Sequence, residues 1–151
     1  MKRAAPAESL NRTAFQATVH CLTGCAIGEI LGLAIGMTLG WDDLPTIVLA
    51  IALAFVFGYG LTMLPLLRRG LPLRAAVTTA FAADTISITT MEIVDNAIIV
   101  AVPGAMDAGL ISLLFWSSLG FALAVAFVVT FPVNRWLISR GLGHAAVHTH
   151  H

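Results

Sequence analysis

Four long, mainly apolar stretches limit this chain to very few folds. Each is at least as long as the roughly 20 residues that an α-helix needs to cross a bilayer. Their apolar residues come in blocks rather than along one face, so lipid must be the solvent for most of the surface. The sequence therefore predicts an all-α protein, a bundle of four transmembrane helices. We expect these helices at about residues 18–39, 45–67, 75–102 and 110–131.

Composition supports a protein embedded in lipid. Hydrophobic residues make up 58% of the chain and charged residues only 11%, whereas a soluble domain carries about 25% charged residues. No basic stripe with interleaved aromatic residues is present, so the bilayer is an expected partner and nucleic acid is not. We expect an N-terminal tail at 1–14, a transmembrane domain at 15–138 and a His-rich tail at 139–151.

The basic residues predict the orientation of the chain. All eight Lys and Arg residues lie in the N-terminal tail, in the second loop or after the fourth apolar stretch, and the first and third loops hold none. Short loops that remain in the cytoplasm are enriched in Lys and Arg. We therefore expect both termini and the second loop in the cytoplasm, and the first and third loops outside.

The first apolar stretch carries two stripes of residues spaced four apart. Small residues at this spacing allow another helix to approach closely, so the first stripe is interpreted as a packing device. This stripe consists of His20, Gly24, Gly28, Gly32 and Gly36. The second stripe lies beside it and consists of Cys21, Cys25 and Glu29.

The two cysteines share one helix face. Residues four apart point the same way, which favours joint coordination of a soft metal ion over an internal disulfide. His20 adds an imidazole next to the pair. The alternative is that both cysteines are simply small, well-packed side chains.

The third apolar stretch places acidic residues inside the membrane. Each central acid costs about 2.5–3.5 kcal/mol on the lenient insertion scale, and none of the four apolar stretches contains Lys or Arg. The acids must be protonated, hydrogen-bonded to polar neighbours or neutralised by a bound cation. One predicted face holds Asp84, Ser87, Met91 and Asp95, and the adjoining face holds Thr85, Glu92 and Asn96.

The C-terminal tail is rich in histidine. Clustered histidines bind Cu or Zn ions, and this tail is expected on the same side of the membrane as His20. The alternative is a tail without a role of its own. Its histidines are His144, His148, His150 and His151.

These features lead to the hypothesis of a membrane protein that binds a transition-metal ion, Cu or Zn, and transports it or hands it over. The alternatives are a non-enzymatic subunit of a larger membrane complex and a proton-coupled transporter that uses the carboxylates. Four helices leave little room for a permeation path, so a transporter would assemble as a homo-oligomer. No enzyme is expected, because neither a nucleotide-binding loop nor a Cys-x-x-Cys motif is present. The candidate metal ligands are His20, Cys21, Cys25, Glu29, Asp84, Met91, Glu92, Asp95, His144, His148, His150 and His151.

Four segments together carry a resemblance to a known family. They begin at His20, Met91, Pro103 and Phe131 and read HCLTGCAIGE, MEIVDN, PGAMD and FPVNR. In these segments the chain resembles a family of small bacterial membrane proteins known as domain of unknown function 4396, over about residues 16–151. The resemblance implies a protein of the bacterial inner membrane and implies no activity.

Overall fold

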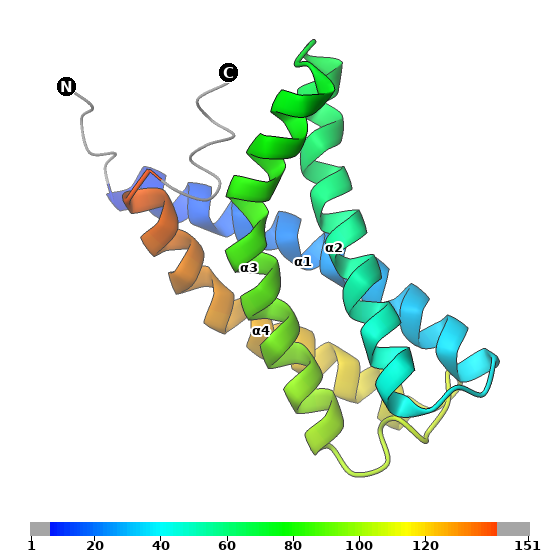
Figure 1. Cartoon of the computed structure of the whole chain (residues 1–151). Coiled ribbons are helices and arrows are strands. Elements are labelled where there is room, and N and C mark those ends of the chain that lie inside the picture. Colours follow the sequence, from blue (N-terminus) through cyan, green and yellow to red (C-terminus); the bar gives the residue numbers. More distant parts are fainter. Residues whose placement is uncertain (1–6, 142–151) are drawn as a thin grey trace.

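The computed structural model describes residues 7–141, with side chains from residue 9 onward. All regular secondary structure in this part of the chain is helical. Four helices follow one another in alternating directions, so the start of α1, the α2–α3 turn and the end of α4 lie at one end of the bundle (Figure 1). The α1–α2 turn and the α3–α4 loop lie at the other end. The helices are α1 (Ala7–Thr38), α2 (Asp43–Arg68), α3 (Leu73–Ala101) and α4 (Leu113–Ser139).

Two helices extend beyond the predicted apolar stretches. Helix α1 begins at Ala7 instead of near residue 18, and α4 continues through Pro132 to Ser139. Proline removes one backbone hydrogen bond, but helices within membranes tolerate it where neighbours compensate. Helix α2 likewise continues past Pro65.

Three of the helices have the length and apolar composition of membrane spans. Within the described residues these are Ser9–Thr38, Asp43–Arg68 and Leu113–Ser139. Helix α3 is long enough at 29 residues, but it carries three acidic side chains and is not among these three spans. The chain is thus an all-helical protein with three helices suited to cross a membrane.

The glycine stripe of α1 packs directly against α2. A Cβ atom added to Gly24 would lie 2.7 Å from Cα of Gly58, and one added to Gly28 would collide with the backbone of Ala54. The predicted role of the stripe in close helix packing is confirmed, and the helix that packs against it is α2 of the same chain. The matching residues of α2 also recur every four positions, at Thr46, Ala50, Ala54, Gly58, Thr62 and Leu66.

Helix α3 is polar inside and apolar outside. Its buried side chains include every acid it carries, whereas its large exposed side chains are apolar except for Arg74 at its start. The hydroxyl groups of Thr78, Thr89 and Thr90 donate to carbonyl oxygens four residues earlier in the same helix, so this surface presents few unsatisfied polar groups. The large exposed apolar residues are Leu73, Val77, Phe81, Ile86, Ile93 and Val100.

Candidate functional site

The predicted polar face of α3 forms part of the bundle interior. Asp84, Ser87, Met91 and Asp95 are all at most 1% exposed, which confirms that they share a buried face. The adjoining Glu92 and Asn96 are buried as well. Thr85 is only half-buried, and its hydroxyl group lies 2.7 Å from the Tyr59 hydroxyl group of α2.

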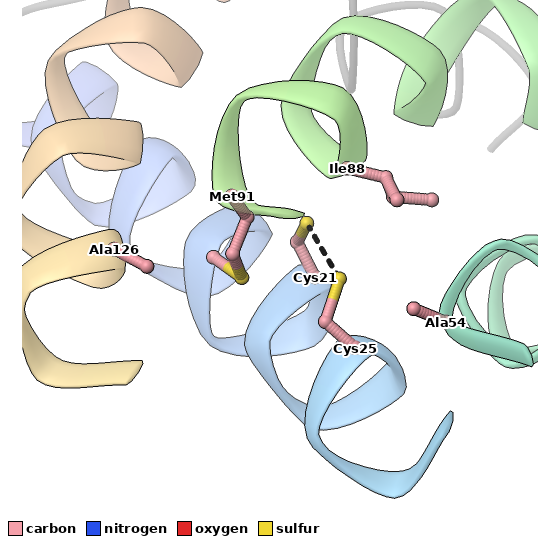
Figure 2. Close-up of a cluster of buried hydrophobic side chains, with 6 residues drawn as sticks. All are labelled: Cys21, Cys25, Ala54, Ile88, Met91 and Ala126. Atoms are coloured by element: carbon pink, nitrogen blue, oxygen red, sulfur yellow. Dashed lines mark hydrogen bonds between the residues drawn. The ribbon is translucent and has the colours of Figure 1, made fainter. Parts of the chain in front are cut away.

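The two cysteines, called the thiol pair below, lie together in the bundle core. Both are free and buried, and their Sγ atoms are 3.9 Å apart. Met91 of α3 lies beside them in the same cluster, and the other members of this cluster are apolar (Figure 2). The spacing of residues along the sequence did not predict this contact between the thiol pair and Met91, which the packing of α3 against α1 creates. The cluster also contains Ile88 of α3, Ala54 of α2 and Ala126 of α4.

Glu92 brings a carboxyl group next to the thiol pair. Its side chain interacts with Cys25, and its Oε2 accepts a hydrogen bond of 3.2 Å from Nδ2 of Asn96. Asn96 also donates to the backbone oxygen of Glu92, at 2.9 Å. This amide fixes the carboxyl group, while Oε1 of Glu92 receives no hydrogen bond.

Glu29 and Asp95 face each other across the contact between α1 and α3. Both side chains are fully buried, and their carboxyl groups interact with each other. No N–H or O–H group of the described residues donates to any of their four oxygens. We call these two residues the carboxyl pair.

His20 belongs to a different group from the thiol pair. Its Nε2 lies 2.8 Å from Oγ1 of Thr62 in α2, and Thr62 in turn interacts with Asp84 of α3. His20 is half-buried and lines an open hollow of about 420 Å³, together with Phe15 and Leu61. Sequence analysis missed Thr62, although its place on the four-residue stripe of α2 is a signal that it faces inward.

Asn134 is a second residue that sequence analysis did not select. It is 2% exposed and links three helices. Its Oδ1 accepts a hydrogen bond from Ser87 of α3, and its Nδ2 donates to Oγ1 of Thr18 in α1 at 3.0 Å. A buried amide on an otherwise apolar helix is the signal that marks such a position.

No arginine among the described residues is buried beside Glu29, Glu92 or Asp95. All six arginines among the described residues are exposed, and Arg135 bonds to Asn11 at the end of the bundle. A lone carboxylate in such an interior is strongly disfavoured. The acids therefore depend on protons, on polar neighbours or on a cation brought from outside the chain.

The structure divides the candidate ligands into three adjoining groups. These are the thiol pair with Met91 and Glu92, the carboxyl pair, and His20 with Asp84. No cluster of three or more His, Cys, Asp or Glu side chains in the described part of the chain is arranged to hold a metal ion. The tail ligands His144, His148, His150 and His151 lie outside the described residues.

Comparison of the chain with known proteins gives a family and no closer relative. Neither the curated proteins nor the solved structures yielded a match. The family model described as a domain of unknown function (DUF4396) matches residues 10–143, nearly the whole chain. The protein therefore belongs to this family, as its four sequence segments indicated.

Proposed function

We propose that this protein binds a soft transition-metal ion inside the membrane and transports it or hands it over. The observation that carries the proposal is the thiol pair, whose two free, buried Sγ atoms lie 3.9 Å apart beside the Met91 thioether. Thiolate and thioether sulfurs select Cu(I), and thiolates also bind Zn(II). The cysteines and Met91 supply these donors within one cluster.

The spacing of the two sulfur atoms suits a shared ion. Metal–sulfur bonds of about 2.3 Å at a tetrahedral angle place two sulfur ligands about 3.8 Å apart. The observed 3.9 Å separation is close to this value, so the two thiol groups need little movement to bind one ion. Glu92, whose side chain interacts with Cys25, adds a carboxyl group near the same cluster.

The other two groups extend the site along the bundle. His20 and Asp84 lie nearer the end where α1 begins, and the carboxyl pair lies further along α1 and α3. An ion moving along these helices would meet an imidazole and a carboxyl group first, then sulfur, then carboxyl groups. Such a series of ligands supports passage or transfer of an ion rather than a single structural metal site.

We further propose that α3 is the fourth membrane span and that both termini face the cytoplasm of a bacterial cell. The support for the span is the inverted pattern of α3, whose acids face the bundle while Phe81, Ile86 and Ile93 are exposed. The orientation rests on the arginines, which lie near the start of α1, at the α2–α3 turn and near the end of α4.

Metal binding by the purified, untagged protein in lipid nanodiscs tests the function. We expect about one Cu(I) or Zn(II) per chain, offered as Cu(I) under reducing conditions or as Zn(II) alone. Because each sulfur atom is a direct ligand, Cys21→Ser, Cys25→Ser and Met91→Leu should each weaken binding by more than about tenfold. Affinity is measured by competition with a chromophoric chelator.

Met63→Leu is the matched control, because Met63 is a methionine of α2 outside the cluster. It should bind metal as the wild type does. Equal metal content in the wild type and in both cysteine variants, including no metal in any of them, would contradict the proposal. That result, together with co-purification of a larger complex, would favour an accessory subunit instead.

A further inference from the structure

An open hollow of about 420 Å³ lies between the first half of α1 and the second half of α2. Two of its polar side chains already have partners. The Thr23 hydroxyl group donates to the carbonyl oxygen of Val19 at 2.8 Å, and Nε2 of His20 lies 2.8 Å from Oγ1 of Thr62. Because α1 and α2 both suit a membrane span, the open side of the hollow faces lipid. We call it the α1 hollow, and its lining residues are Phe15, Gln16, Val19, His20, Thr23 and Leu61.

A positive charge lies in line with the α1 hollow. Arg12 is exposed and precedes Gln16 by four residues and Val19 by seven, so these three side chains follow one face of α1. Gln16 is exposed as well and carries amide N–H donors between the guanidinium group and the apolar wall. Along this face, α1 therefore changes from cationic through polar to apolar.

Arg135 of α4 brings a second guanidinium group to the same end of the hollow. Its Nε donates to Oδ1 of Asn11 at 2.6 Å. One turn further along α1, the ring of Phe15, which lines the hollow, meets the ring of Phe127 edge to face, with centroids 5.6 Å apart. These contacts join the start of α1 to the end of α4, which lie together in Figure 1. Asn11 occupies one of the five N–H donors of the guanidinium group and orients the others.

The described residues supply no acid at this end of the bundle. Among residues 9–141, the exposed acids Asp42, Asp43 and Asp107 belong to the opposite end, where α1 ends and α4 begins. The remaining acids of this range are buried among the helices. An anion that pairs with Arg12 and Arg135 must therefore come from outside the described part of the chain.

We propose that this surface binds one anionic phospholipid, with the phosphate group at Arg12 and Arg135 and one acyl chain in the α1 hollow. Guanidinium groups bind phosphate through charge-assisted, often bidentate hydrogen bonds, and basic pockets beside membrane helices bind anionic lipid headgroups. The order of guanidinium, amide and apolar groups along α1 matches the order of phosphate, glycerol and acyl chain in the lipid. The thiol pair takes no part, so this inference does not rest on metal binding.

Native mass spectrometry of the detergent-solubilised protein, titrated with phosphatidylglycerol or with phosphatidylcholine of the same acyl chains, tests the site. We expect one phosphatidylglycerol per chain, bound at least about tenfold more tightly than phosphatidylcholine. The double variant Arg12→Gln, Arg135→Gln should lose this preference, because it removes both cationic donors. Far-UV circular dichroism confirms that the variant retains its helices.

The double variant Arg68→Gln, Arg74→Gln is the control, since it removes the same charge from exposed positions at the two ends of the α2–α3 turn. It should keep the preference for phosphatidylglycerol. Val19→Trp fills the hollow without changing charge and should also weaken lipid binding. Equal binding of the two lipids by the wild type, or an equal loss in both arginine double variants, would overturn the proposal, because either result indicates general attraction to charge. Unchanged binding by Val19→Trp would contradict an acyl chain in the hollow.

Discussion

Single polar residues hold the helices of this protein in register. In a lipid environment apolar side chains give helices little reason to associate, so interhelical hydrogen bonds and close contacts carry more of the specificity. Asn134 illustrates this, because its amide bonds to Ser87 on one helix and to Thr18 on another. Thr62 has a similar position between His20 and Asp84.

Replacing Asn134 with leucine should destabilise the bundle by about 0.5–2 kcal/mol, since it removes two interhelical hydrogen bonds and leaves buried hydroxyl groups behind. Unfolding of the protein in mixed micelles, followed by circular dichroism, measures the change. Thr78→Ala is the control, because Thr78 is exposed and bonds only to the backbone of its own helix. Equal stability of both variants would show that the Asn134 network contributes nothing.

At the scale of the helix, small residues determine which pairs come close. The α1–α2 contact is built from glycines of α1 and from Ala50, Ala54 and Gly58 of α2, so the two backbones approach each other closely at these positions. This places α2 on the side of α1 next to the thiol pair, and leaves the Cys21–Glu29 side of α1 to α3. On that side of α1, Cys25 and Glu29 interact with Glu92 and Asp95 of α3.

Gly28→Ala is expected to destabilise the protein by about 1–3 kcal/mol, because the new Cβ overlaps the backbone of Ala54 and forces α1 and α2 apart. Gly120→Ala provides the comparison, since a Cβ at Gly120 meets no atom within 4 Å. Alanine there should stabilise the helix slightly, by up to about 1 kcal/mol. The same unfolding assay distinguishes the two, and a Gly28→Ala protein as stable as the wild type would refute the close contact.

At the scale of the whole molecule, the distribution of polar and apolar side chains differs from that of a soluble protein. Large apolar side chains are exposed on α3, and thiol, carboxyl and amide groups lie in the interior among apolar side chains. Such an arrangement is stable only where lipid surrounds the bundle, because water would otherwise solvate the acids and expel the exposed apolar side chains. The proposed position of α3 as a fourth membrane span rests on this arrangement, since three helices are shown to suit a membrane.

Cysteine labelling tests this topology in whole cells of a bacterial host. In a Cys21→Ser, Cys25→Ser background, Asp107→Cys lies after α3 and Pro72→Cys lies just before it, and both positions are exposed. We expect a membrane-impermeant maleimide to label residue 107 and to reach residue 72 only after the cells are broken. Labelling of both positions in intact cells, or of neither, would show that α3 does not cross.

Much of this architecture can be predicted from the spacing of residue types along the sequence. The four helices, the buried face of α3 and the close-packing role of the glycine stripe all follow from spacing, because side chains three or four residues apart on a helix must share a face. The grouping of the ligands does not follow from spacing. His20 joins Thr62 and Asp84, Glu29 meets Asp95, and the cysteines meet Met91, because the crossing of four helices decides which faces touch. Helix crossings depend on contacts between residues far apart in the chain, and a local pattern contains no information about them.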